Sequence, residues 1–78
     1  MKITIMKPAR KFIASQNLKI QQRISEAICK LPFEGDIRPI TGKENIFRLR
    51  LGNIRIVYMW ENDTIEIQDA GYRGDIYK

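Results

Sequence analysis

The feature that most constrains the fold is the stretch 46–60, in which two apolar-rich segments flank the dipeptide Gly52-Asn53. A Gly-Asn pair between runs of β-branched and aromatic residues predicts a β-hairpin with a two-residue turn. With the turn at this dipeptide, Arg50 faces Arg55 across the two strands. This register decides which side chains share a face, because side chains alternate along a strand.

One face of the predicted hairpin is apolar and the other is basic. The apolar face carries Phe47, Leu49, Leu51, Ile54, Ile56, Tyr58 and Trp60. The opposite face carries Arg48, Arg50 and Arg55. Like charges that face each other across a sheet destabilise it by roughly 0.2–1 kcal/mol per pair. Three guanidinium groups on one small patch therefore favour a site for a polyanion, and a solvated strand face is the structural alternative.

Before the hairpin, the sequence predicts one short strand and two helices. Apolar and polar residues alternate over 2–6, which indicates a strand. Pro8 suits the first turn of a helix, where its missing N–H is not needed. Asn17 is a suitable N-cap for a second helix over 18–31. One face of that helix carries Ile20, Ile24, Ala27, Ile28 and Leu31.

After the hairpin, a tight turn at 61–63 leads to a further strand over 64–68. When the apolar alternation is extended across this turn, Ala70 lies opposite Arg55 on the basic face. Gly71 then lets the chain turn into a short C-terminal segment.

These elements predict an α+β fold with the order β-α-α-β-β-β. Two N-terminal helices pack on one face of an antiparallel sheet, which gives a two-layer domain. Residues 32–45 are expected to be mostly loop, with a brief strand possible near Ile37-Arg38. We expect the whole chain, residues 1–78, to form a single domain.

The charge balance and the missing histidine narrow the classes of function. The chain has 14 Lys and Arg against 9 Asp and Glu, a formal net charge of +5 at pH 7. Such an excess favours nucleic acid or another polyanion as a partner, and suits an acidic binding protein equally well. Histidine is absent, which excludes histidine-based metal sites and Ser-His or Cys-His catalysis. We expect no metal and no cofactor.

The sequence predicts a cytoplasmic localisation. Cys29 is the single cysteine, so no internal disulfide is possible, and the chain is compatible with a reducing compartment. No apolar run approaches the roughly 20 residues of a membrane span, and the N-terminus lacks the apolar core of a signal peptide. We therefore expect no membrane partner.

Three segments together resemble the RelE/ParE toxin superfamily, and its RelE-like branch in particular. They are 35–42, 47–58 and 71–77, with the sequences GDIRPITG, FRLRLGNIRIVY and GYRGDIY. The resemblance covers essentially the whole chain. It implies a toxin of a type II toxin–antitoxin system that enters the ribosomal A site and cuts messenger RNA there. In that scheme the ribose 2′-OH attacks the adjacent phosphodiester, which gives a 2′,3′-cyclic phosphate and a free 5′-OH.

The resemblance also implies site residues. The catalytic positions fall on Arg50, Arg55, Arg73 and Tyr77. The RNA-binding candidates are Arg48, Lys43 and Tyr72, of which Lys43 is chosen as an exposed residue near the start of the hairpin. The well-studied relatives carry lysine where Arg48 and Arg50 stand, and many carry histidine where Tyr72 stands. Because arginine keeps its proton, proton transfer falls to Tyr72 or Tyr77, or catalysis rests on positioning and cationic stabilisation.

The partners implied are a cognate antitoxin, messenger RNA and the ribosome, together with operator DNA as a possible target of the toxin–antitoxin complex. Two other functions remain open. One is a ParE-like inhibitor of DNA gyrase, which cleaves nothing. The other is a non-catalytic member that binds RNA or the antitoxin. An endoribonuclease that inhibits translation is the leading hypothesis.

Overall fold

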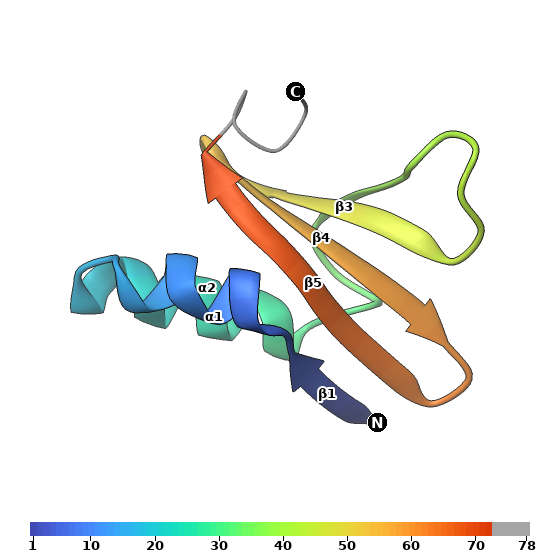
Figure 1. Ribbon diagram of the computed structural model, residues 1–78, viewed down its shortest axis with the longest axis horizontal. Helices are drawn as coiled ribbons and strands as arrows, with labels where there is room; N and C mark the ends of the chain where they lie inside the picture. Colours follow the sequence, from blue (N-terminus) through green and yellow to red (C-terminus); the bar gives the residue numbers. More distant parts are fainter. Residues whose placement is uncertain (73–78) are drawn as a thin grey trace.

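The computed structural model describes residues 1–72 (Figure 1). Its elements are β1 (Lys2–Ile5), α1 (Lys7–Ala14), α2 (Leu18–Cys29), β2 (Asp36–Pro39), β3 (Ile46–Leu51), β4 (Ile54–Glu61) and β5 (Thr64–Tyr72). The strands form one sheet in the order β1-β5-β4-β3-β2. All neighbouring pairs are antiparallel except β1 and β5, which are parallel.

The predicted α+β architecture, with two helices packed on one face of the sheet, is confirmed. The sheet is wider than the predicted meander, because β1 joins it at one edge and β2 at the other. The strand considered near Ile37 is β2, which pairs with β3. Figure 1 shows the two helices lying together on one side of the strands, next to β1 and β5.

The helix boundaries follow from local chemistry. Pro8 lies in the first turn of α1, where the sequence predicts it. The Asn17 side chain accepts a hydrogen bond of 2.9 Å from the N–H of Ile20 and so caps α2. This helix ends at Cys29, two residues before the predicted Leu31. Leu31 is nevertheless part of the core, because it is only 4% exposed.

The core is a single layer between the helices and the apolar face of the sheet. The hairpin register is the predicted one, with Arg50 opposite Arg55. The buried residues are Ala9, Ile24, Ile28, Leu31, Leu49, Ile54, Ile56, Tyr58, Ile65, Ile67 and Ala70. Phe47 stacks on Tyr58 with ring centroids 5.5 Å apart, which extends this layer along the hairpin.

A β-bulge in β5 corrects one predicted pairing. Val57 pairs with Asp69 while the next residue of β4 pairs with Ile67, so Gln68 is an extra residue in β5. An extra residue in one strand reverses the faces of all residues that follow it. The predicted pairing of Ala70 with Arg55 is therefore wrong, and Ala70 is buried on the helix side.

The bulge also changes the role of Gly71. This glycine pairs with Arg55 inside β5 and does not turn the chain, because the strand continues to Tyr72. In the last residues of β5, each side chain therefore lies on the face of the sheet opposite to the predicted one.

Candidate functional site

Four arginines lie on the sheet face that the helices leave uncovered. Arg38 pairs with Arg48 between β2 and β3, and Arg50 pairs with Arg55 between β3 and β4. Because paired residues point to the same side, all four share one face, which we call the arginine face. Each pair places like charges opposite each other, an arrangement that opposes stability and suits the binding of an anion.

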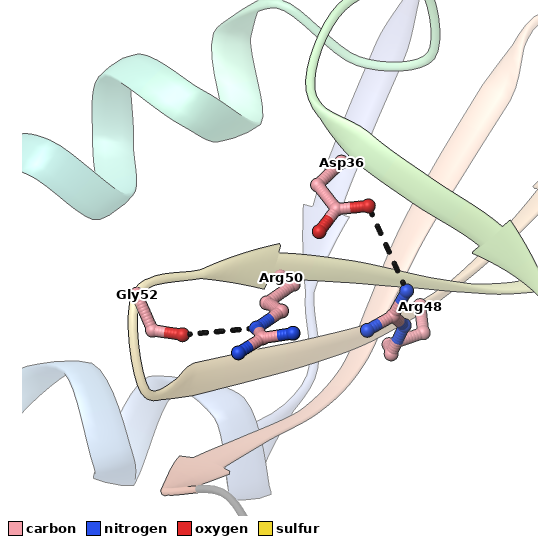
Figure 2. A network of polar contacts seen from close by, with 4 residues as sticks. All are labelled: Asp36, Arg48, Arg50 and Gly52. Atoms are coloured by element: carbon pink, nitrogen blue, oxygen red, sulfur yellow. Dashed lines mark hydrogen bonds and ion pairs between the residues drawn. The ribbon is translucent and has the colours of Figure 1, made fainter.

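Arg48 is the most enclosed of the four. Only 8% of its surface is exposed, although it lies on the uncovered face. Its Nη2 atom is 3.8 Å from Oδ1 of Asp36, the first residue of β2. Figure 2 shows the guanidinium reaching from β3 toward this carboxylate.

Arg50 is exposed and bends toward the hairpin turn (Figure 2). Its Nε donates a hydrogen bond of 3.3 Å to the carbonyl oxygen of Gly52. Gly52 has a φ of 62°, whereas Asn53 has a negative φ. A positive φ at the first central position alone is the pattern of a type II′ turn, which favours glycine there. The turn thus supplies the acceptor that orients Arg50.

Arg55 is half-buried on β4, opposite Arg50 on one side and Gly71 on the other. Because residue 71 is a glycine, β5 places no side chain beside Arg55 at this point of the sheet. Two carboxylates on this side of β5 are engaged locally: Glu66 accepts a hydrogen bond from Gln68, and Asp69 from the N–H of Ala70.

Tyr72 lies on the other side of the sheet. It pairs with Ile54, a core residue, so its side chain is on the face that the helices cover. Its hydroxyl donates a hydrogen bond of 2.6 Å to Oε1 of Gln16. Its ring makes an edge contact with Phe12, with centroids 5.3 Å apart. The RNA-binding candidate Tyr72 therefore lies on the opposite side of the sheet from Arg48, Arg50 and Arg55, because the bulge at Gln68 reverses the faces at the end of β5.

Of the remaining predicted residues, Lys43 lies apart and two fall outside the structure. Lys43 is exposed in the loop between β2 and β3, at the end of β3 that is far from Arg50. Arg73 and Tyr77 lie outside the described residues. The structure therefore brings together Arg48, Arg50 and Arg55.

Two residues of the face, Arg38 and Asp36, were missed as site residues. The signal that could have identified them was the alternation of a strand near Ile37. If that segment is extended, Asp36 and Arg38 point to the same side and Ile37 points to the core. What the sequence does not show is that this strand pairs with β3, which brings Arg38 next to Arg48.

A groove of about 470 Å³ opens where α2 and the following loop approach β3. Its apolar lining consists of Ala27, Leu49 and Leu51, together with Gly35. Its charged lining consists of Arg23, Glu26, Lys30, Glu34, Asp36 and Arg50. Asp36 and Arg50 belong both to this groove and to the sheet face. A ligand on the arginine face can therefore continue into the groove.

Tyr58, whose pKa is shifted by burial, does not lie on the arginine face. Tyr58 is fully buried in the core, and its hydroxyl has no hydrogen-bond partner within residues 1–72. Burial raises the pKa of Tyr58 to about 12, because the phenolate would lose its hydration. This group cannot carry protons for a ligand on the other face.

The part of the chain that the structure describes holds no group of three or more His, Cys, Asp or Glu side chains that could bind a metal ion. Within the same residues, no helix is long and apolar enough to cross a membrane.

The chain was compared with known proteins. No protein-family model matches it, and no curated protein matches it significantly. Among solved structures, a chain of the RelB–RelE antitoxin–toxin complex from Methanococcus jannaschii matches with a TM-score of 0.80 at 29% identity, over 95% of this chain and 94% of that chain. A chain of the archaeal RelE–RelB complex from Pyrococcus horikoshii matches with a TM-score of 0.76 at 25% identity, over 95% and 96%.

A more distant structure, from the RelBE2 toxin–antitoxin complex of Mycobacterium tuberculosis, shares the fold with a TM-score of 0.73 at 19% identity, over 92% and 96% of the two chains. The fold and its basic, uncovered sheet face thus define a small α+β protein of the toxin class. The chain is similar to these RelE structures over nearly its whole length, and it is a RelE-like toxin of a toxin–antitoxin system.

Proposed function

We propose that this toxin is a ribosome-dependent endoribonuclease that inhibits translation by cutting messenger RNA in the ribosomal A site. The observation that carries the proposal is the arginine face, with Arg38, Arg48, Arg50 and Arg55 on one uncovered side of the sheet. Single-stranded RNA offers a row of phosphates, and arginine binds phosphate through two parallel N–H···O contacts. The likeness to RelE chains from antitoxin–toxin complexes supports the toxin part of the proposal.

The proposed reaction is the attack of a ribose 2′-oxygen on the neighbouring phosphorus. An O–P bond forms, the bond from phosphorus to the 5′-oxygen breaks, the 2′-OH loses its proton, and the leaving 5′-oxygen gains one. The products are a 2′,3′-cyclic phosphate and a 5′-OH. Negative charge accumulates on the phosphoryl oxygens in the transition state, where fixed cations stabilise it. In this proposal Arg50 and Arg55 stabilise that charge, and Arg48 holds a flanking phosphate.

Proton transfer is the step to which the arginines contribute least, since arginine keeps its proton at neutral pH. The Tyr72 hydroxyl already donates to Gln16 on the other face of the sheet. We therefore assign proton transfer to Tyr77 and a further stabilising charge to Arg73. Both assignments rest on the family resemblance, because these residues lie outside the described part of the chain.

The test is induced expression in a bacterial host, followed by mapping of messenger 5′ ends. The wild-type protein should arrest growth and produce new 5′-OH ends in translated regions. Arg55→Ala and Arg50→Ala should each lower cleavage about 100-fold or more, which is the usual effect of removing one group that stabilises transition-state charge. Arg10→Ala removes the same charge from the exposed surface of α1 and serves as the matched control.

Undiminished toxicity of the Arg50→Ala and Arg55→Ala proteins would contradict the proposal. Growth arrest with intact messages and inhibited DNA supercoiling would favour a ParE-like gyrase inhibitor. Circular dichroism of each variant checks that it is folded, and Arg50 is the safer position because its side chain is exposed.

We also propose that a cognate antitoxin silences this toxin. The support is that the similar RelE chains were crystallised in complexes with RelB. A short reading frame beside the gene, when co-expressed, should restore growth and co-purify with the toxin. The purified complex can then be tested for operator DNA binding by gel shift.

A further inference from the structure

Arg48 is a buried guanidinium whose hydrogen-bonding capacity is not used within residues 1–72. Its one ion pair in this part of the chain is with Asp36, at 3.8 Å, and it makes no hydrogen bond there. A charge-assisted hydrogen bond between a guanidinium and a carboxylate is about 2.7–2.9 Å long. Asp36 therefore offsets the charge of Arg48 but leaves its N–H groups available to a ligand.

Asp36 is held in place through its backbone, while its side chain remains partly in solvent. It starts β2 directly after Gly35, which has a φ of 128°. A Cβ atom at Gly35 would lie 2.7 Å from Cδ1 of Leu49, so the chain passes close to the core at this point. The Asp36 side chain is 53% exposed and reaches diagonally, past its register partner Arg50, toward Arg48 (Figure 2).

These two observations give Asp36 opposite effects in the free and the bound protein. Without a ligand, the carboxylate lowers the free energy of a buried cation that would otherwise be unpaired. When a phosphate binds Arg48, the same carboxylate repels it and competes for the guanidinium. A half-exposed carboxylate can then turn into solvent, whereas Arg48 remains enclosed.

We infer that Asp36 is a positioning residue that holds Arg48 ready in the free protein and is displaced by an RNA phosphate. It stabilises the fold and weakens RNA binding at the same time. The inference rests on the proposed RNA-binding function and adds to it a regulator of affinity inside the site.

The test compares Asp36→Asn with Asp63→Asn. Asp63 is an exposed residue in the turn between β4 and β5, and its carboxylate lies 3.9 Å from the Met1 amino group. Each variant therefore loses one negative charge from an ion pair of similar length, but only Asp36 touches the arginine face. The probe is a short single-stranded 2′-O-methyl RNA, which lacks the attacking hydroxyl and stays intact during titration.

The expected result is that Asp36→Asn binds the RNA about two- to fivefold more tightly than the wild-type protein, the range given by one partly exposed ion pair. The same variant should unfold at a lower urea concentration. Asp63→Asn should change the affinity less than about 1.5-fold, because its charge is distant and screened by salt. A residue with only a structural role would, on substitution, lower stability and affinity together.

A double-mutant cycle with Arg48→Gln assigns the effect to the pair. The gain from Asp36→Asn should disappear when Arg48 is replaced, and an equal gain in both backgrounds would overturn the inference. Equal gains from Asp36→Asn and Asp63→Asn would also overturn it, while RNA binding by the wild-type protein would leave the proposed function standing. If the wild-type protein does not bind the RNA at all, RNA binding by this face and the inference both fail.

Discussion

The two faces of the sheet differ most clearly along β4, where neighbouring residues serve opposite purposes. Ile54, Ile56 and Tyr58 are buried under the helices, whereas Arg55 and Val57 between them are only half-buried. The helix face, meaning the side covered by α1 and α2, is closed and apolar. The arginine face is open and carries like charges in direct opposition. Stability therefore depends mainly on one face, and the capacity to bind an anion belongs to the other.

The largest expected effect comes from a cavity on the helix face. Ile56→Ala should lower the free energy of unfolding by about 2–5 kcal/mol, because it removes fully buried methyl groups from a closed core. Val57→Ala, one residue along on the other face, should lower it by less than about 1.5 kcal/mol. Urea denaturation of the two variants measures the difference. Equal losses would mean that the two faces are not distinct in their contribution to stability.

The second effect is a pH dependence that belongs to the core. The pKa of Tyr58 is raised from 10.0 to about 12, so the folded state disfavours the phenolate. The stabilisation is complete below pH 10 and is lost as the pH rises from 10 to 12. Relative to Tyr58→Phe, the wild-type protein should lose about 2–3 kcal/mol of unfolding free energy over this interval.

The comparison with Tyr58→Phe removes the contributions of other groups that titrate at high pH. At neutral pH this variant should be at least as stable as the wild-type protein, because it eliminates a buried hydroxyl without a hydrogen-bond partner in residues 1–72. Parallel loss of stability in both proteins above pH 10 would show that Tyr58 ionises as freely when folded as when unfolded.

A smaller effect tests the position of Tyr72. Tyr72→Phe removes the hydrogen bond to Gln16 and should lower the unfolding free energy by about 0.5–1.5 kcal/mol. Because the side chain lies on the helix face, the affinity for single-stranded RNA should not change. Thermal or urea unfolding and an RNA titration of the same sample measure both quantities. Weaker RNA binding at unchanged stability would place the hydroxyl on the arginine face instead.

The smallest effect on stability is expected at Arg50. Arg50→Gln should change the unfolding free energy by no more than about 0.5 kcal/mol, since the side chain is exposed and the substitution relieves its opposition to Arg55. Its effect on RNA binding should be larger. The slope of log affinity against log salt should become shallower by about 0.7, the value for one lost phosphate contact on a single strand. An unchanged slope would exclude Arg50 from the phosphate contacts.

Several elements of the fold were predictable because their signals are local. The Gly-Asn turn determines the hairpin register, and the two-residue period then places Arg48, Arg50 and Arg55 together. Asn17 marks the start of α2, because its side chain accepts a hydrogen bond from the N–H of Ile20, only three residues further along the chain. The pairing of β4 with β5 also matches the prediction near the turn, where Trp60 pairs with Ile65 and Tyr58 pairs with Ile67.

The prediction failed where a single residue changed the register. The bulge at Gln68 moves Ala70 into the core and Tyr72 onto α1. A regular strand would place Asp69 and Gly71 after Ile67 on the helix face, whereas the bulge places Ala70 there and moves the Asp69 carboxylate to the other face. The bulge is favoured by contacts made far along the chain, among them the bond from Tyr72 to Gln16.

By itself, the sequence determined that this protein would carry a basic patch on one side of a hairpin, because turn chemistry and side-chain alternation act between near neighbours. Only the tertiary structure decided what surrounds that patch. The pairing of β2 with β3 adds Arg38 and Asp36, and the packing of β5 against α1 removes Tyr72. These outcomes depend on pairings between distant segments, whose free energies are set by the assembled core and not by any one stretch of chain.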